Sequence, residues 1–387
     1  MKNHFVIGLN SGTSFDGIDT ALVKFSKGSL TPTFIDGFVY KYPNGLKERI
    51  RKLITPVETC RGMSLEEISQ LNFLIGEIFA EAANTIIKRN KLINKDILLI
   101  GSHGQTIFHH PQIESFGKYR INSTLQIGES SIIASKTGIK TVSNFRESDI
   151  AAGGTGAPLI PYLDQIVFGN SKIPKAALNI GGISNITIVG KNITPIAFDI
   201  GPGNGLIDLI CNIYFKKDFD LNGKIAKTGK IDFTAIEKAL RDPYFKQKPP
   251  KSTGKEYFNL KFIEKYFAQI KNSKDKIATL TYFTAKTIER AFHNFIFPKY
   301  KIGEIVISGG GIRNKILMQH LKKLLTIETP RSVSLFVHSD KYNLPYKYKE
   351  AILFALLGYT CFKGIPNNIP SCTGAKKKAI LGKIVNV

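Results

Sequence analysis

Cysteine is scarce and tryptophan is absent from this chain of 387 residues. The four cysteines, Cys60, Cys211, Cys361 and Cys372, form no Cys-x-x-Cys pair, and no His/Cys cluster has the spacing of zinc ligands. This pattern argues against a disulfide framework and against a structural zinc site. It predicts ordinary reduced thiols, as in a cytoplasmic protein.

Long apolar runs are also missing. The segment 351–362 is apolar but too short to span a bilayer. The N-terminus leads directly into a predicted strand, without a charged region followed by a long apolar stretch, so no signal peptide is expected. We therefore expect a soluble cytoplasmic protein with no membrane partner.

Several common signatures of catalysis are absent. The chain has no Gly-x-x-x-x-Gly-Lys-Ser/Thr loop, no protein-kinase motif set and no Gly-x-Ser-x-Gly elbow. Gly201 and Gly203 begin a Gly-x-Gly-x-x-Gly pattern, but its third position is Leu206, which argues against a Rossmann dinucleotide site. His109 and His110 are adjacent and would point to opposite faces of a strand, so we predict no metal site there.

Acidic residues are few relative to basic ones. The chain has 54 Lys and Arg against 30 Asp and Glu, for a formal charge of +24. Nucleic-acid binding is one explanation, but the lysines are scattered, and the densest run, 376–378, is short. A general lysine bias is favoured, so we expect no nucleic-acid partner, although the field would help to steer an anionic substrate.

Length and composition indicate two α/β domains. The chain is about twice a typical domain in length, and its 43% hydrophobic content is enough for two cores. A strand-turn-strand pattern opens each half, which indicates two related halves with a ligand bound between their turns. The expected strands cover residues 5–9, 19–25, 32–40, 95–101, 176–180, 186–189, 196–200 and 305–308, and helices are expected at 65–82, at 206–213 and after Asn314. A polar loop is expected at 102–106, and the region 126–160 has no clean periodicity.

The first turn, in residues 8–19, combines glycines, hydroxyls and two carboxylates. Its backbone N–H groups could surround an oxyanion, while an aspartate holds a metal ion beside it. The alternative is an ordinary hairpin turn. A similar turn at 181–185 favours the anion-binding interpretation.

Asp199 ends an apolar strand and precedes Gly-Pro-Gly-Asn, where a helix is expected to begin. A carboxylate at a strand's C-terminal end faces the crevice in which α/β proteins bind ligands, and the helix N-terminus offers N–H groups to an anion. The two glycines and the proline suit close approach by a ligand. We therefore predict that Asp199 accepts a proton from a hydroxyl or a water. The alternative is a plain helix cap.

Three further features each have a functional and an ordinary interpretation. Residues 309–311, all glycine, would let adenine lie against bare backbone, or they form a plain strand-to-helix loop. Glu350 begins an apolar helix, either as a ligand contact or as a first-turn acid. Arg146 lies between apolar segments and would bind an anion, or it is a surface arginine.

Together these segments resemble the anhydro-N-acetylmuramic acid kinase family, in family order over nearly the whole chain. The matching stretches are 8–19, 101–106, 125–128, 151–158, 179–185, 198–204, 249–254, 309–314, 349–351 and 371–375. The resemblance implies the actin, Hsp70 and sugar-kinase fold, with two RNase-H-like domains and ATP in the cleft between them. We place these domains at 1–145 and 146–372, with the tail 373–387 packed back on the first.

The resemblance also implies the reaction. The family opens the 1,6-anhydro ring of anhydro-N-acetylmuramic acid and phosphorylates O6 with ATP, which gives N-acetylmuramic acid 6-phosphate in cell-wall recycling. Asp199 matches the family's general base, which takes a proton from the water that attacks C1 while O6 attacks the γ-phosphate. Phosphoryl transfer needs mainly positioning and charge neutralisation by backbone N–H groups and Mg²⁺, which suits glycine-rich turns.

The match assigns further residues to each ligand. Arg146 and Glu350 match the sugar site, His103 is a weaker candidate there, and Asp16 is the candidate Mg²⁺ ligand. The ATP-binding residues implied are Ser11, Gly12, Thr13, Ser14, Phe15, Asp16, Gly17, Ile18, Gly181, Gly182, Ser184, Gly201, Gly203, Gly309, Gly310, Gly311 and Asn314.

The chain also departs from the family pattern. The family usually has Met where this chain has Asn10, Leu at Phe15, Asp at Asn144, Thr at Ile200, and Arg-His-Arg-Pro at 108–111, which here reads Phe-His-His-Pro. Loss of basic groups near a sugar carboxylate would weaken a charge-assisted contact, so a levoglucosan or other hexose kinase stays an alternative. A non-catalytic ATPase of the same fold is a further alternative, and a homodimer is left open.

Overall fold

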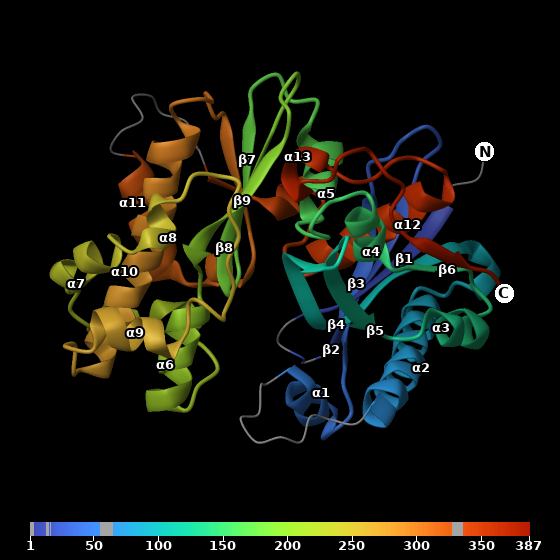
Figure 1. Cartoon of the computed structure of the whole chain (residues 1–387), viewed down its shortest axis with the longest axis horizontal. Helices are drawn as coiled ribbons and strands as arrows, with labels where there is room; N and C mark the ends of the chain where they lie inside the picture. Colours follow the sequence, from blue (N-terminus) through green and yellow to red (C-terminus); the bar gives the residue numbers. More distant parts are fainter. Residues whose placement is uncertain (1–3, 13–14, 16, 55–64, 327–335) are drawn as a thin grey trace. The chain divides into compact units, whose positions relative to one another are not determined.

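The structure is a computed structural model that describes residues 4–12, 15, 17–54, 65–326 and 336–387. Its contacts divide the chain into two compact units (Figure 1): unit 1 comprises Met1–Val167 and Asn343–Val387, and unit 2 comprises Phe168–Tyr342. Residues 146–167 and 343–372 thus belong to unit 1, although the expected domain ranges place them in the second domain. Because compact units need not coincide with homologous domains, the domain ranges stay a prediction.

Unit 1 contains a mixed sheet in the order β12-β6-β4-β1-β2-β3, with β5 paired to β4. β1 to β3 form an antiparallel meander, β4 runs parallel to β1, and β6 runs parallel to β4. The short strand β12 pairs with β6, so the C-terminal tail extends the sheet of unit 1. The strands are β1 (His4–Ser11), β2 (Gly17–Phe25), β3 (Thr33–Lys41), β4 (Ile97–Phe116), β5 (Tyr119–Ile127), β6 (Thr141–Ser143) and β12 (Lys383–Val385).

Unit 2 repeats this topology. Its sheet has the order β11-β10-β7-β8-β9, with an antiparallel meander from β7 to β9 and two strands, β10 and β11, parallel to β7. The strands are β7 (Lys175–Ile180), β8 (Ile183–Val189), β9 (Ile196–Pro202), β10 (Glu304–Ser308) and β11 (Phe336–His338). Five strands of unit 1, in the order β6-β4-β1-β2-β3, therefore match the five strands of unit 2 in order and direction, which confirms the prediction of a duplicated, RNase-H-like α/β fold.

Two helices cover opposite faces of the unit 1 sheet. α2 buries an apolar stripe that includes Leu71, Ile75 and Phe79 against Ile7 and Leu9 of β1. The side chains of a strand alternate between its faces, so the intervening residue Gly8 faces the other way, toward α12. The helices of unit 1 are α1 (Leu46–Ile54), α2 (Leu65–Arg89), α3 (Ser130–Thr137), α4 (Phe145–Ala151), α5 (Ile160–Phe168), α12 (Lys349–Phe362) and α13 (Pro370–Thr373).

Helix α12 lies unusually close to its sheet. A Cβ atom on Gly8 would overlap the carbonyl oxygen of Ala351, and one on Gly101 would overlap that of Phe354. Only glycine on β1 and β4 allows this approach. The contact fixes the first turn of α12, which carries Glu350, beside the C-terminal half of β1.

Unit 2 has two apolar cores. One lies between the sheet and the helices α10 and α11, and contains Leu178, Ile188, Ile288 and Leu321. The other is rich in aromatic residues from the segment that follows β9. The helices of unit 2 are α6 (Gly205–Phe215), α7 (Phe233–Ala239), α8 (Pro243–Lys246), α9 (Leu260–Phe267), α10 (Ser273–Ala291), the π-helix η4 (Phe292–Ile296) and α11 (Lys315–Thr326).

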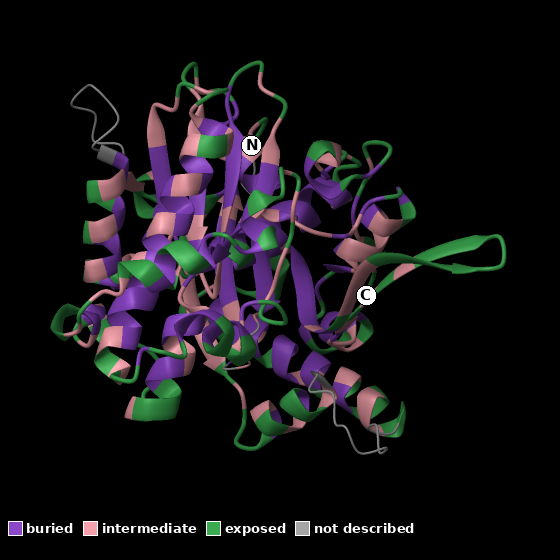
Figure 2. Ribbon diagram, turned by 60° about the vertical axis from the view of Figure 1, so that its left-hand side comes forward, coloured by how far each residue is buried: buried purple, intermediate pink, exposed green. Residues whose placement is uncertain are grey.

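One sequence expectation was wrong at β4. The polar loop expected at 102–106 lies within this strand, which continues to Phe116. Ser102, His103 and Gln105 are buried there. Pairing with β1 at Ser102, and with β1 and β5 at Gln105, places these residues in the sheet. The C-terminal part of β4 and the N-terminal part of β5 form an exposed two-stranded ribbon (Figure 2). Among the helices of the described ranges, none has both the length and the hydropathy needed to cross a membrane.

Candidate functional site

Three glycine-rich segments meet at the ends of β7, β9 and β10 in unit 2. The N–H of Gly203 donates to the carbonyl of Gly182 at 2.9 Å, and the N–H of Asn204 donates to the carbonyl of Gly181 at 2.7 Å. A Cβ on Gly309, which has φ +88°, would lie 2.6 Å from the carbonyl oxygen of Ile180. The predicted turns therefore come together at one edge of the unit 2 sheet, beside the N-terminus of α6.

The glycines at this edge serve two different needs. A Cβ on Gly203 would overlap the carbonyl oxygen of Gly181, and one on Gly311 would overlap the side chain of Ile180. On Gly181 itself, the nearest atom would be 3.5 Å away, an ordinary contact. Gly203 and Gly311 are thus required by packing within unit 2, whereas Gly181 leaves room that a ligand can use.

The two glycines after Asp199, Gly201 and Gly203, are needed for packing within unit 2. We interpreted them as room for a ligand, but a Cβ on Gly201 would lie 2.9 Å from the ring of Phe245, and Gly203 is needed by its own backbone contacts. Their small size is therefore explained by the fold. Whether either glycine contacts ATP stays a prediction.

Asp199 is held at its backbone and at its carboxylate. Its N–H donates to the carbonyl of Lys251 at 3.0 Å, and its own carbonyl accepts from the Tyr244 hydroxyl at 2.6 Å. The carboxylate oxygen Oδ2 accepts from the Ser252 hydroxyl at 2.8 Å and from the N–H of Thr253 at 3.0 Å. Burial raises the pKa of Asp199, while the hydrogen bonds from Thr253 and Ser252 lower it.

The alternative interpretation of Asp199 as a helix cap was wrong. Asn204 occupies the N-cap position of α6, and the carboxylate of Asp199 bonds to Ser252 and Thr253 instead. A register shift in the pairing of β8 with β9 places Asp199 opposite Asn185 but Gly201 opposite Ser184. The bulge lies directly after Asp199, and bulges of this kind change the direction in which neighbouring side chains point.

The residues that hold Asp199 were missed by the sequence analysis. The stretch 249–254 was part of the family match, but no role was assigned to it. Its Lys251 ammonium lies 4.3 Å from the ring centroid of Tyr244, and burial lowers the pKa of Lys251 to about 8 against the opposing effect of Asp199. The family match at 249–254 indicated that this stretch has a role, but it did not show that the stretch contacts Asp199.

Two of the predicted ATP residues in unit 2 make contacts within the fold. Ser184 is fully buried, and its hydroxyl donates to the carbonyl of Pro202 at 3.3 Å. Asn314 caps α11 by accepting from the N–H of Leu317 at 3.1 Å. Both side chains stabilise the turns at this edge, and their contact with ATP stays a prediction.

The first turn of unit 1 is described in part, because Thr13, Ser14 and Asp16 lie outside the described residues. The Ser11 hydroxyl bonds to the side chain of Gln105 at 2.6 Å, which ties the end of β1 to β4. Ile18 is fully buried in the core under α2.

The backbone conformation at Phe15 and the space around Gly12 and Gly17 describe the rest of this turn. Phe15 has φ +55°, and a Cβ on Gly17 would overlap the carbonyl oxygen of Tyr40. A Cβ on Gly12 would meet no described atom within 4 Å. Gly12 therefore leaves open space among the described residues, whereas a Cβ on Gly181 in unit 2 would make ordinary contacts without overlap.

Arg146 and His103, both predicted for the sugar site, are hydrogen-bonded to each other. The Nε of Arg146 donates to Nε2 of His103 at 2.9 Å, and its Nη1 donates to the carbonyl of Gly156 at 2.8 Å. His103 Nδ1 lies 3.2 Å from the carbonyl of Gly104, so the ring carries its proton on Nδ1. Burial and the charge of Arg146 hold the pKa of His103 well below its ordinary value, which keeps the ring neutral.

Glu350 lies in the same unit beside two polar strand residues. Its Oε2 accepts from the side-chain amide of Asn10 at 2.7 Å. Burial and the charge of Glu350 raise the pKa of Asp19 to about 7. Burial lowers the pKa of Arg146, and the charge of Glu350 opposes that shift. Unit 1 thus brings the three predicted sugar-site residues into one electrostatic group.

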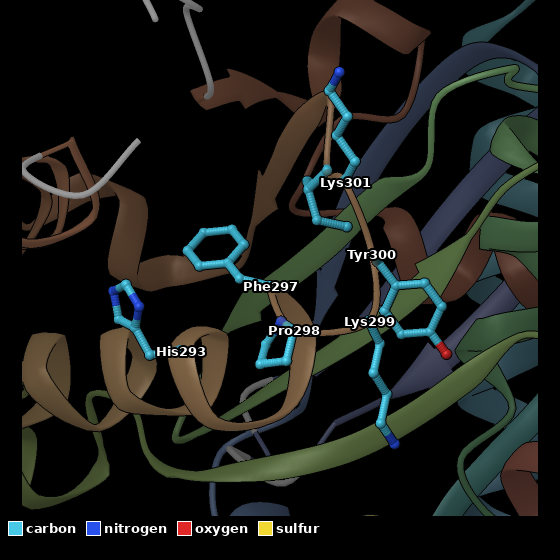
Figure 3. A pocket seen from close by; sticks show the side chains of 7 residues that line it. His293, Phe297, Pro298, Lys299, Tyr300 and Lys301 are labelled. Carbon is cyan, nitrogen blue, oxygen red and sulfur yellow. The ribbon is translucent and has the colours of Figure 1, made fainter. Parts of the chain in front are cut away.

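A separate hollow of about 530 Å³ lies in unit 2 (Figure 3). It is lined by residue 293, which lies within η4, and by residues 297–302, which lie between η4 and β10. None of the predicted site residues lines it. Across the described ranges, no group of three or more His, Cys, Asp or Glu side chains is arranged to hold a metal ion.

Comparison with known proteins identifies the family. The family model described as anhydro-N-acetylmuramic acid kinase matches residues 4–387. The chain belongs to the anhydro-N-acetylmuramic acid kinase family. The enzyme of that name from Caldanaerobacter subterraneus subsp. tengcongensis is 42% identical over 99% of this chain and 97% of its own length. The one from Francisella tularensis subsp. novicida is 41% identical over 98% of each chain.

Similarity to solved structures is much lower. Component A of the (R)-2-hydroxyglutaryl-CoA dehydratase of Acidaminococcus fermentans has a TM-score of 0.42 and 14% identity, with 92% of this chain and 98% of that chain covered. That similarity is too low to bear on fold or function. The assignment of this chain to its kinase family therefore rests on sequence.

Proposed function

We propose that this protein opens the 1,6-anhydro ring of anhydro-N-acetylmuramic acid and phosphorylates O6 with ATP. Family membership along nearly the whole chain supports this activity. The observation that carries the chemistry is the Asp199 carboxylate, which has one oxygen fixed by two donors while the other has no hydrogen-bond partner among the described residues.

In this reaction Asp199 acts as the general base. Its free oxygen Oδ1 takes a proton from water as the water oxygen forms a bond to C1. The bond between C1 and O6 breaks, O6 forms a bond to the γ-phosphorus, and ADP leaves with the electron pair of the broken phosphoanhydride bond. Burial raises the pKa of Asp199, which makes the carboxylate a stronger base than an exposed aspartate.

The remaining predicted residues divide between the two ligands. Arg146 and Glu350 would bind the sugar, with His103 orienting the Arg146 guanidinium. The turns around Gly12 and Gly181 would bind the ATP phosphates through backbone N–H groups, because packing within the described structure does not require glycine at either position.

Mg²⁺ belongs to this proposal as the usual partner of ATP. Asp16 would hold it; a single protein carboxylate is in keeping with Mg²⁺, which often relies on one or two carboxylates, nucleotide phosphates and water. The ion would neutralise charge on the phosphates. We also propose a cytoplasmic location, with no nucleic-acid partner, and we keep the homodimer as a hypothesis.

A direct assay tests the proposal. Purified full-length protein is incubated with ATP, Mg²⁺ and each of anhydro-N-acetylmuramic acid, levoglucosan and N-acetylmuramic acid, and sugar phosphate and ADP are measured. The expected result is sugar 6-phosphate from the first substrate, after which the relatives are named, with little from levoglucosan. ATP hydrolysis that is equally fast without any sugar would point to a non-catalytic ATPase of this fold and would overturn the proposal.

A further inference from the structure

The segment 251–254 of unit 2, which we call the strap, contacts Asp199 from a part of the chain more than fifty residues away. We propose that Ser252 and Thr253 of the strap position the base: they hold Oδ2 of Asp199 and leave Oδ1 to take the proton from water. This inference rests on the proposed function, because it assigns the roles of the two oxygens within that reaction.

Two hydrogen bonds hold the backbone of Asp199. β9 is the edge strand of the unit 2 sheet, so the N–H of Asp199 has no strand partner on its outer side and donates to the carbonyl of Lys251. The Tyr244 hydroxyl bonds to the Asp199 carbonyl. Only the side-chain torsions stay free, and the bonds from Ser252 and Thr253 remove that freedom.

The strap is itself held at both ends. At one end the Lys251 ammonium bonds to the carbonyl of Tyr244 at 3.3 Å and lies over its ring. At the other end the N–H of Phe258 donates to the carbonyl of Gly254 at 3.1 Å, and Phe258 is buried in the aromatic core. These contacts anchor the backbone of the strap, and with it the N–H of Thr253, as positioning requires.

The hydrogen bonds from Ser252 and Thr253 also oppose the effect of burial on the pKa of Asp199. A half-buried carboxylate would keep its proton to higher pH, because burial disfavours the charged form. Donors to Oδ2 favour the charged form and so limit the rise in the pKa of Asp199 that burial causes. Glu256, just beyond the strap, acts in the opposite direction by repelling the charge of Asp199, and Lys251 attracts it.

The test compares four full-length proteins: the wild type, Ser252→Ala, Ser252→Thr and Ser171→Ala. Ser252→Ala removes one donor, and Ser252→Thr restores a hydroxyl. Ser171→Ala is the matched control, because Ser171 is an exposed serine of unit 2 whose hydroxyl bonds to the carbonyl of Ile173. The measurements are kcat/KM against pH, the KM for ATP, and the carboxyl ¹³C shift of Asp199 against pH, assigned by its loss in Asp199→Asn.

In Ser252→Ala we expect the acidic limb of kcat/KM and the midpoint of the ¹³C titration to move upward together by about one pH unit. Turnover at neutral pH should fall about tenfold while the KM for ATP is unchanged. Ser252→Thr should restore both midpoints, and Ser171→Ala should match the wild type.

If the acidic limb of kcat/KM and the midpoint of the ¹³C titration do not move in Ser252→Ala, the inference is overturned, whether or not the activity falls. The ¹³C titration needs no substrate. If the wild type does not phosphorylate the sugar but Ser252→Ala still shifts the titration, the proposed function fails while the contact of the strap with Asp199 stands.

Discussion

Nε of Arg146 donates a 2.9 Å hydrogen bond to Nε2 of His103, a buried ring that stacks on Phe354. Nη1 donates to the carbonyl of Gly156, so Nη2 is the nitrogen of the guanidinium that has no partner among the described residues. An arginine held at two of its nitrogens presents the third in a fixed direction, which suits recognition of an anion.

Arg146→Lys should therefore impair sugar binding more than nucleotide binding. Lysine keeps the charge but cannot donate from fixed positions to His103, Gly156 and a ligand at once. We expect the KM for the sugar to rise about tenfold or more, as for a lost charge-assisted hydrogen bond, with little change in the KM for ATP. Steady-state kinetics with each substrate varied in turn measure this, and an unchanged sugar KM would remove Arg146 from the sugar site.

Asp199→Asn should abolish sugar turnover and preserve ATP affinity. The amide is close in size to the carboxylate but cannot accept the proton of the attacking water. The expected loss in kcat is about 10² to 10⁴-fold, the usual contribution of a general base. ADP release gives kcat and calorimetry gives the ATP affinity; a variant with near-normal turnover would show that another group is the base.

Asn10→Leu tests whether the contact between Asn10 and Glu350 serves the sugar. The substitution removes the 2.7 Å bond from the Asn10 amide to Glu350 and keeps a similar volume. We expect the sugar KM to rise about tenfold, because a hydrogen bond to a charged group is worth about 1.5–3 kcal/mol. Equal changes in the KM values of sugar and ATP would argue that the pair is only structural.

Valine at Gly12 or Gly181 should weaken nucleotide binding without unfolding the protein. Both positions have room within the described structure, so the added side chain would crowd the phosphates instead. Calorimetry should show a weaker affinity for ATP at an unchanged Tm. Gly203→Ala is the contrasting variant: its Cβ overlaps the Gly181 carbonyl, so it should lower the Tm. Full ATP affinity in both valine variants would place the phosphates elsewhere.

Asp19 should make stability depend on pH. Burial and Glu350 raise its pKa from 3.8 to about 7 in the folded protein, so the folded state binds more protons than the unfolded state between these values. The free energy of unfolding therefore falls as pH rises through this window. Asp19→Asn cannot ionise, so its Tm relative to the wild type should be higher at pH 8 than at pH 4.

Calorimetry at the two pH values checks the Asp19 prediction. Glu264→Gln, at an exposed position of α9, serves as the control and should show no such difference. The same Tm difference for Asp19→Asn at both pH values would contradict the raised pKa.

Much of the fold could be predicted from local patterns. Apolar runs with β-branched residues predicted the strands near 5–9, 176–180 and 305–308, and the structure has β1, β7 and β10 there. The prediction failed at 102–106, because the buried polar residues of β4 resemble a loop in sequence. Pairing with β1 and β5 places these residues in the sheet, and no local pattern records that pairing.

The candidate site was only partly predictable for a similar reason. Glycine patterns located the turns, but they did not distinguish Gly203, which packing requires, from Gly181, where a Cβ would make only ordinary contacts. Asp199 was found because it follows a strand and precedes a helix. Ser252 was not assigned a role, because its partner lies far away in the sequence.

The order of residues by itself determined the strands, the turns that follow them and the family, because these depend on the periodicity and composition of short segments. Tertiary structure alone decided which oxygen of Asp199 is held, which glycines are needed for packing, and that Asn10 bonds to Glu350, 340 residues away. Such contacts depend on how distant segments pack, and the packing of a helix on a sheet is not encoded in any one window of sequence.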